Sequence, residues 1–250
     1  EATKEVADII LRDDNFSTIV NTIREGRRIY HNILAFIKYM LSANFDTIMA
    51  VGVLTILGFP LPILPLQILW INIATDSLPA LALGASEADK DIMKARPHKK
   101  QESIFKKFFD FILIASIFQT ITNIAIYFFG RYEDLLLGIN LAEYAQSSHA
   151  RTMVFTEIVI FELLLVFVCK EEKSINLKTF TSNKKLILAV LFSFLLQLCM
   201  IYHPFMQEVF KTVSLNATEW LVIIIPATSA FLVPKATKFA RSVLKYKHEV

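Results

Sequence analysis

Six long apolar segments run through this chain, and they constrain its fold more than any other feature. They are predicted at about residues 33–58, 66–85, 108–129, 152–169, 185–203 and 219–234. Most are close to the roughly 20 residues that an α-helix needs to cross the hydrocarbon core of a bilayer. Of the 250 residues, 54% are hydrophobic and only 20% are charged, which leaves little room for a large soluble domain. The chain is therefore predicted to be an all-α polytopic membrane protein with six transmembrane helices.

Residues 1–32 form a polar stretch ahead of the first span. Within it, the apolar run from Val6 to Leu11 predicts a short buried strand. From Ser17 onward isoleucines recur on one helical face, which predicts a helix that continues into the first span. We therefore expect three parts: this strand and helix, a membrane domain at 33–237, and a basic tail at 238–250. The first residues form no secretory signal and include no initiator methionine, so we expect a fragment of a longer protein.

Lysine and arginine are concentrated on one side of the predicted membrane domain. Seven lie in residues 86–107, five in 170–185 and five from Lys235 onward, whereas each intervening connection carries at most two. Basic residues are in excess in cytoplasmic loops, so these segments and both termini are expected to be cytoplasmic. The plasma membrane and an internal membrane fit equally well. A net charge of +3 does not indicate nucleic acid, and the expected partner is the lipid bilayer.

Four carboxylates lie inside the predicted spans. Asp46 is in the first span, Asp76 in the second, and Glu157 and Glu162 are in the fourth. On insertion scales a carboxylate at the bilayer centre costs about 2.5–3.5 kcal/mol, so each is a candidate functional residue. Glu157 is explained equally well by pairing with a polar side chain on a neighbouring span.

The second span carries three oxygen-bearing side chains close to one another. Each residue of an α-helix turns by about 100°, so Asn72 and Asp76 share a face and Thr75 lies beside them. Pro79 follows shortly after and favours local unwinding, which would expose backbone carbonyls. Amide, hydroxyl and carboxylate oxygens, without histidine or cysteine, suit a hard cation such as calcium, magnesium or sodium.

The first span offers a second group of oxygen-bearing side chains. Asn44 and Thr47 share a face at three-residue spacing. Asp46 is about 200° from Asn44 around the helix and points elsewhere. Helical geometry alone therefore leaves open whether Asp46 belongs to a cation site.

Two strings of sequence are specific enough to indicate a family. Residues 7–33, ADIILRDDNFSTIVNTIREGRRIYHNI, resemble the end of the phosphorylation domain and the stalk of P-type cation-transporting ATPases. Residues 67–97, QILWINIATDSLPALALGASEADKDIMKARP, resemble the sixth transmembrane helix of that family and its following cytoplasmic loop. A shorter likeness is TMVFTEIVIFE at 152–162. The six spans would then be the last six of the ten helices of such a pump.

The resemblance implies a set of cation ligands and one departure from the family pattern. The implied ligands are Asn44, Asn72, Thr75, Asp76 and Glu162, with Thr47 completing the predicted set. The asparagine of LWIN is similar to the calcium-pump branch, since sodium/potassium pumps usually carry aspartate there. Calcium pumps have a glutamate where Thr47 stands, and Asp46 precedes it. Three explanations stay open: Asp46 replaces that acid through a local distortion, one ion is carried per cycle, or the ion is not calcium.

The resemblance also implies the function of the whole pump. It would move cations, calcium in the first place, out of the cytoplasm by alternating access coupled to an aspartyl-phosphate formed in other domains of the same pump. Those domains would bind Mg-ATP, and no catalytic residue is expected in this chain. Glu87, Asp89 and Asp91 of the cytoplasmic loop either couple the domains or simply form a solvated loop. A regulatory subunit is neither indicated nor excluded.

Three alternatives to a calcium pump remain at this point. A sodium, potassium or proton pump of the same family would differ in the ion that stimulates turnover. A secondary transporter or channel complete in these 250 residues would transport without ATP. A non-transporting membrane scaffold would use the buried acids only to pair helices, and its thermal stability would not respond to ions.

Overall fold

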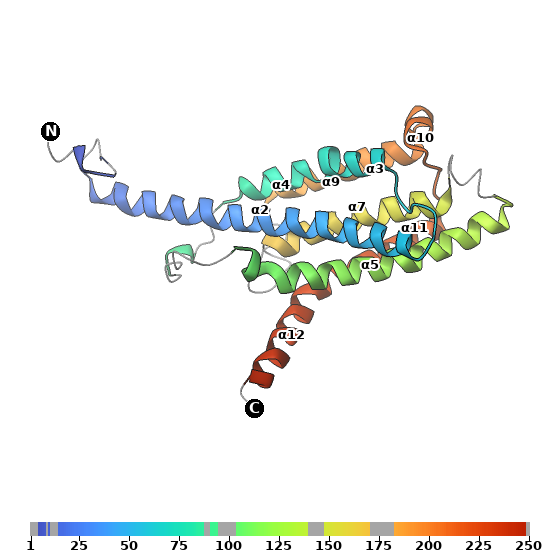
Figure 1. Ribbon diagram of the computed structural model, residues 1–250. Coiled ribbons are helices and arrows are strands. Elements are labelled where there is room, and N and C mark those ends of the chain that lie inside the picture. Colours follow the sequence, from blue (N-terminus) through green and yellow to red (C-terminus); the bar gives the residue numbers. More distant parts are fainter. Residues whose placement is uncertain are drawn as a thin grey trace.

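The chain forms an elongated bundle of helices (Figure 1). The computed structural model describes residues 5–8, 10, 15–87, 91–94, 104–139, 148–170 and 183–248. Within these residues the regular structure is helical throughout, and six helices are long and apolar enough to cross a membrane. The predicted all-α, six-span architecture is therefore confirmed.

The first span is the C-terminal part of one long helix, α2 (Phe16–Ile56). It begins after Asn15, whose side chain accepts a hydrogen bond of 3.0 Å from the Ser17 N–H. This cap supplies one of the partners that the first N–H groups of a helix need. The predicted helix from the polar N-terminal region thus continues into the membrane segment without a break.

The described residues of the predicted N-terminal strand form no strand within this chain. Residues 6–8 and 10 of the expected run are described, and they form no strand. Val6 is 84% exposed and Ile10 is 52% exposed. A buried strand needs a neighbouring strand for its backbone hydrogen bonds and a core for its side chains. The described part of this chain offers neither at this end.

The remaining spans lie close to their predicted positions, with different ends. The second span is divided into α3, a π-helical turn η1 and α4, and the sixth into α11, a 3₁₀ turn η3 and α12. The bounds are α3 (Pro65–Trp70), η1 (Ile71–Thr75), α4 (Ser77–Gly84), η2 (Ile92–Lys94), α5 (Ile104–Leu136), α7 (His149–Lys170), α9 (Lys184–Tyr202), α10 (Pro204–Phe210), α11 (Ala217–Ala227), η3 (Thr228–Leu232) and α12 (Val233–His248).

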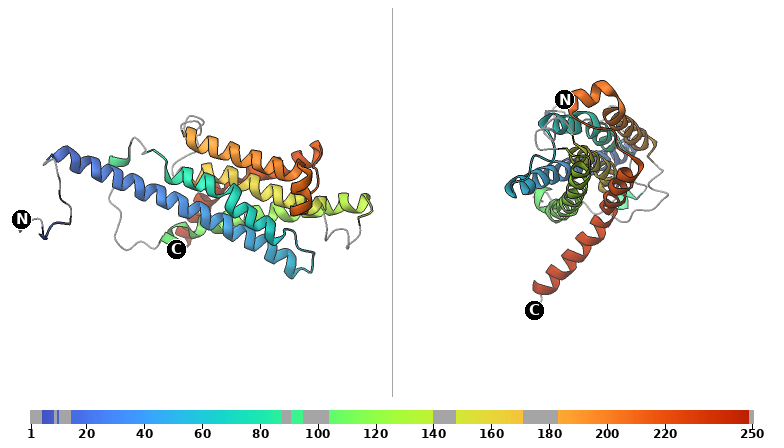
Figure 2. Two further views of the ribbon diagram at one scale, coloured as in Figure 1. Left: turned by 90° about the horizontal axis from the view of Figure 1, so that it is seen from above. Right: turned by 90° about the vertical axis from the view of Figure 1, so that its right-hand side faces the viewer.

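The C-terminal segment is helical over most of its length. Helix α12 continues to His248, and Figures 1 and 2 show it leaving the bundle at an angle. The change of direction follows Pro226, which lies inside α11 and is followed by the 3₁₀ turn η3. Proline lacks an N–H and disrupts the preceding helical turn, so the helix changes pitch at this point.

Helix α7 is the interior helix of the bundle. Of its most apolar stretch 94% is buried, compared with 28% for α9. It lies between α2, α5 and α9 in Figure 1. A helix that is apolar on all sides is expected in the interior, where other helices cover it. Glu157 and Glu162 are therefore carried into the centre of the protein rather than toward lipid.

Helices α5 and α7 approach closely at Gly130, which gives a first testable prediction. A Cβ atom at this position would lie 2.4 Å from the Cα and 2.8 Å from the N of Ala150. We expect Gly130→Ala to lower the midpoint of thermal unfolding of the detergent-solubilised full-length protein, because overpacking typically costs about 1–3 kcal/mol. Gly52→Ala on α2 is the matched control, since its Cβ would meet nothing within 4 Å. Equal midpoints in the two variants would contradict the close approach.

Candidate cation site

The second span is irregular directly before Asp76. The Asp76 N–H bonds to the Ile71 carbonyl at 2.9 Å, a spacing of five residues instead of four. The Ser77 hydroxyl donates to the Asn72 carbonyl at 2.7 Å across the same turn. Single π-helical turns of this kind are frequent at functional sites. Here the turn positions Asp76 at the junction between two short helices.

Pro79 contributes to this irregularity, but the carbonyl groups do not become free. Proline has no N–H to offer the carbonyl of Thr75, four residues earlier. That carbonyl accepts a hydrogen bond of 2.9 Å from the hydroxyl of Ser193 on α9 instead. The Thr75 hydroxyl donates to Ile71 O at 3.0 Å. The second span is therefore irregular at this point, but the Thr75 carbonyl that Pro79 leaves without a helical donor is hydrogen-bonded to Ser193 of α9.

Asp76 is almost fully buried, with 1% of its surface exposed. The hydroxyl of Tyr39 on α2 donates to its Oδ1 at 2.9 Å. Its Oδ2 accepts no hydrogen bond from the described residues. Tyr39, itself 0% exposed, was not predicted as a site residue. It lies seven residues before Asp46, hence on the same face of α2, and this spacing was a signal in the sequence.

Asp46 and Glu162 lie near Asp76, and Glu157 lies near both of them. Asp46 on α2 and Glu157 and Glu162 on α7 are each 0% exposed. Asp46 lies close enough to Asp76 and Glu157 to interact with their charges. Glu162 interacts in the same way with Asp76, Asp46 and Glu157. Three separate segments of the chain thus bring four acidic side chains together at the middle of the bundle.

The acidic cluster of Asp46, Asp76, Glu157 and Glu162 is rich in oxygen atoms without donors. Within the described residues, five carboxylate oxygens accept no hydrogen bond from an N–H or hydroxyl group: Asp46 Oδ2, Asp76 Oδ2, Glu157 Oε2 and both oxygens of Glu162. The carboxyl groups of Asp76 and Glu162 lie within hydrogen-bonding reach of each other. The charged groups that act on Asp46 and Glu162 are all acidic. Burying an ionised carboxylate costs several kcal/mol, and like charges add repulsion. A hard cation among these oxygens would relieve both costs.

The first span places Asp46 among the six described spans and Asn44 on a face of α2 that these spans do not cover. Asn44 is exposed, and its amide nitrogen donates to the Met40 carbonyl at 2.8 Å. Because about 200° separates the two residues around the helix, they cannot face the same neighbour. Asp46 reaches the acidic cluster while α2 remains a continuous α-helix, so no local distortion is needed. The structure therefore does not bring Asn44 together with Asp76.

The other predicted ligands lie beside the cluster. Thr47 is 8% exposed, and its hydroxyl lies 3.3 Å from Asp46 Oδ1 while it donates to Ala43 O at 3.1 Å. Asn72 is partly buried and donates to Ile68 O at 3.0 Å, which leaves its amide oxygen as an acceptor. Thr75 is 0% exposed.

The sequence allowed Glu157 either to be a functional residue or to pair with a polar side chain on a neighbouring span, and its two oxygens divide between these roles. Its Oε1 accepts a hydrogen bond of 2.8 Å from the hydroxyl of Thr122 on α5. Its Oε2 accepts none from the described residues. Glu157 therefore pairs with a polar neighbour through one oxygen and presents the other within the acidic cluster.

The predicted coupling loop is only partly described. Glu87 is exposed, and Asp91 forms an ion pair of 2.7 Å with Lys94 that raises the pKa of Lys94 above its ordinary value. Asp89 lies outside the described residues.

Three side chains of α2 hold this loop. Asn32 donates to the carbonyls of Gly84 (3.0 Å) and Ser86 (2.8 Å). Arg28 donates to Ser86 O at 3.1 Å, and Arg27 donates to Ile92 O at 3.0 Å. The loop is thus attached to the same helix that carries Tyr39 and Asp46.

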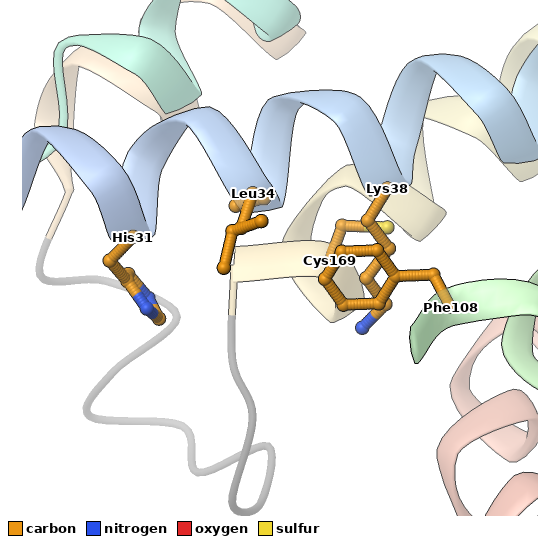
Figure 3. A pocket seen from close by; sticks show the side chains of 6 residues that line it. His31, Leu34, Lys38, Phe108 and Cys169 are labelled. Atoms are coloured by element: carbon orange, nitrogen blue, oxygen red, sulfur yellow. The ribbon is translucent and has the colours of Figure 1, made fainter. Parts of the chain in front are cut away.

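A small pocket nearer the N-terminal part of α2 is not part of this site. It is lined by His31, Leu34, Ala35, Lys38, Phe108 and Cys169 (Figure 3). The Lys38 ammonium lies 3.7 Å from the centroid of the Phe111 ring, a cation–π contact. A lining with a lysine and no carboxylate does not suit a cation.

Comparison with known proteins adds a family to this geometry. Residues 60–240 match the family described as "Cation transporting ATPase, C-terminus". A calcium-transporting ATPase of Bacillus subtilis is 36% identical over 228 residues, which cover 90% of this chain and 24% of that protein. Calcium-transporting ATPase 1 of Yarrowia lipolytica is 32% identical, covering 100% of this chain and 26% of that protein. The chain thus spans about a quarter of the length of these relatives.

Proposed function

Because the chain belongs to the cation-transporting ATPase family, we propose that it forms the cation-binding membrane part of an ATP-driven calcium pump. One observation carries the proposal: four buried carboxyl groups from three segments meet with five oxygens that lack donors among the described residues. The relatives bearing the name calcium-transporting ATPase support calcium as the ion. Mg-ATP would bind to parts of the pump beyond this chain.

The proposed ion ligands lie on two kinds of backbone, regular helix and an irregular turn. Asp46, Glu157 and Glu162 are carried by continuous α-helices. Asp76 lies on the irregular turn of the second span, with Thr75 and Asn72 in the same turn. Calcium takes six to eight oxygens in flexible geometry. Movement at this turn would therefore change the number of ligands, which is what alternating access requires of a binding site.

We propose that Asp46 supplies the acid that Thr47 does not. Asp46 is fully buried and interacts with Asp76, whereas Asn44 lies on a face of α2 that the described spans leave uncovered. This arrangement favours replacement of the family's glutamate by its neighbour over a change of ion.

Helix α2 is the proposed mechanical link between ATP hydrolysis and the site. Its N-terminal half, which carries Asn32 and the two arginines, holds the loop after the second span. Its membrane half contacts the site through the Tyr39 hydroxyl and Asp46. A displacement at the proposed cytoplasmic end would reach both contacts, because a helix of 41 residues transmits movement along its axis. Glu87, Asp89 and Asp91 lie in the loop that would move with it.

The ion that drives turnover tests this proposal. In proteoliposomes containing the full-length protein, we expect calcium to stimulate ATP hydrolysis and ATP to drive calcium uptake. Stimulation by sodium, potassium or protons without calcium would contradict calcium as the ion. Transport in the absence of ATP would favour a secondary transporter, and ion-independent thermal stability would favour a scaffold.

A further inference from the structure

A second group of ionisable side chains lies at the end of the bundle opposite the N-terminus (Figure 1). Glu133 is near the end of α5, His149 is the first residue of α7 and Glu219 is in the first turn of α11. One ligand atom from each lies within 4.8 Å of the other two. His149 is eight residues from Glu157 on α7, about 12 Å at 1.5 Å per residue. The group is therefore separate from the acidic cluster.

Glu219 is held in place by its own helix terminus. It is 0% exposed, and its Oε2 accepts a hydrogen bond of 2.6 Å from the Asn216 N–H. The Glu219 N–H donates in return to Asn216 Oδ1 at 2.9 Å, which completes a capping box. The other oxygen, Oε1, contacts the Nδ1 of His149. Partners of this kind orient a metal ligand before the metal binds.

His149 is anchored by its backbone and remains accessible by its ring. Its N–H donates to Asp134 Oδ1 at 2.8 Å, and the Ala150 N–H lies 3.3 Å from Asp134 Oδ2. The side chain of His149 is 19% exposed, whereas that of Asp134 is 0% exposed. An ion in solution can thus approach the ring without unfolding the helix terminus.

The surrounding charge favours a cation. Glu133 and Glu219 interact with each other, and both interact with His149. Asp134 adds a third carboxylate nearby, and the guanidinium of Arg131 lies 4.0 Å from it. Two carboxylates that close to one imidazole repel each other unless a proton or a metal ion lies between them.

We propose that Glu133, His149 and Glu219 bind a first-row divalent transition metal, with Zn²⁺ the best fit, and that this ion clamps the ends of α5, α7 and α11. One imidazole nitrogen and two carboxylate oxygens suit Zn²⁺, whereas calcium prefers six to eight oxygens. Tetrahedral zinc with bonds of 2.0–2.2 Å separates its ligand atoms by about 3.4 Å. The His149–Glu219 contact would open slightly and Glu133 would move inward.

Zinc titration of the purified full-length protein tests the proposal. The protein is stripped with a chelator and then saturated with calcium, so that the transport site is occupied. We expect one Zn²⁺ equivalent to bind, Co²⁺ in its place to give visible absorption bands, and Zn²⁺ to raise the thermal unfolding midpoint. His149→Ala should weaken zinc binding by about 100-fold or more, since even loss of a residue supporting a ligand costs about 10–100-fold.

Two variants separate metal binding from a structural role. Glu219→Gln keeps a residue that can complete the capping box, so it should fold normally and still lose zinc affinity. His203→Ala is the matched control, because His203 is exposed and follows α9 at the same end of the bundle. Failure of the wild type to bind zinc, or equal zinc affinity in the wild type and His149→Ala, would overturn the proposal. So would equal losses in His149→Ala and His203→Ala. ATPase activity is not the readout, so this result is independent of the pump assignment.

Discussion

Asp76→Asn in the full-length pump is expected to abolish calcium-dependent phosphorylation from ATP at calcium concentrations that saturate the wild type. The substitution keeps the size of the side chain and removes the negative charge at the centre of the acidic cluster. Losing one partner of a buried charge pair costs about 2–5 kcal/mol, and each 1.4 kcal/mol is tenfold in affinity. The apparent calcium affinity should therefore fall by about 30-fold to 3,000-fold. A calcium titration of phosphoenzyme formation measures it.

Two further variants show whether this loss is specific. Asp110→Asn is the matched control, because Asp110 pairs with Arg241 at 3.0 Å on an exposed surface. It should leave the calcium titration unchanged. Tyr39→Phe removes only the donor to Asp76 Oδ1, so a smaller shift of about tenfold or less is expected from one hydrogen bond. Phosphorylation of Asp76→Asn with the same calcium dependence as the wild type would contradict the assignment of Asp76 as a calcium ligand.

Asp46→Asn is expected to weaken calcium binding more strongly than Asn44→Ala. Asp46 is 0% exposed and acts on Asp76, while Asn44 is exposed and bonds to its own helix. Removing the charge of Asp46 should lower the apparent calcium affinity by about 30-fold or more. Equilibrium binding of radioactive calcium, alongside phosphorylation, measures the affinity and the number of ions bound.

The contrast between these two variants tests how the chain compensates for Thr47. If Asn44→Ala weakened calcium binding more than Asp46→Asn, the family pattern would hold and the inward position of Asp46 would be irrelevant to transport. Unchanged affinity in Asp46→Asn, with a thermal unfolding midpoint equal to that of the wild type, would lead to the same conclusion. Thr47→Glu in the Asp46→Asn background extends the test, since it places an acid where calcium pumps usually have one.

The spans were predictable because they depend on the local composition of the chain. A run of about 20 apolar residues has few alternatives to a membrane helix, whatever surrounds it. Local irregularity of the second span was predictable, since Pro79 removes a backbone donor, but the predicted free carbonyls were not found because Ser193 donates to Thr75 O. The strand predicted at Val6 to Leu11 does not form among the described residues, because a short apolar run becomes a strand only where another strand pairs with it. The presence of a pairing strand cannot be deduced from the apolar run alone.

The candidate site was predictable in part. The cost of a buried carboxylate identified Asp46, Asp76, Glu157 and Glu162 one by one, and helical spacing identified Asn44, Thr47, Asn72 and Thr75. Their grouping was not predictable, since the rotation of each helix about its axis depends on its neighbours. Tyr39 became a site residue only when α2 was placed against the second span.

The amino-acid sequence by itself determined that this chain crosses the membrane six times and carries acids in its spans, because burial of apolar surface and of charge acts residue by residue. Only the tertiary structure decided that Asp46 and not Asn44 faces Asp76, and that α7 carries both glutamates into the interior. The physical reason is packing: a helix of fixed periodicity can turn only one face toward its neighbours, and the contacts among α2, α5 and α7 select which face that is.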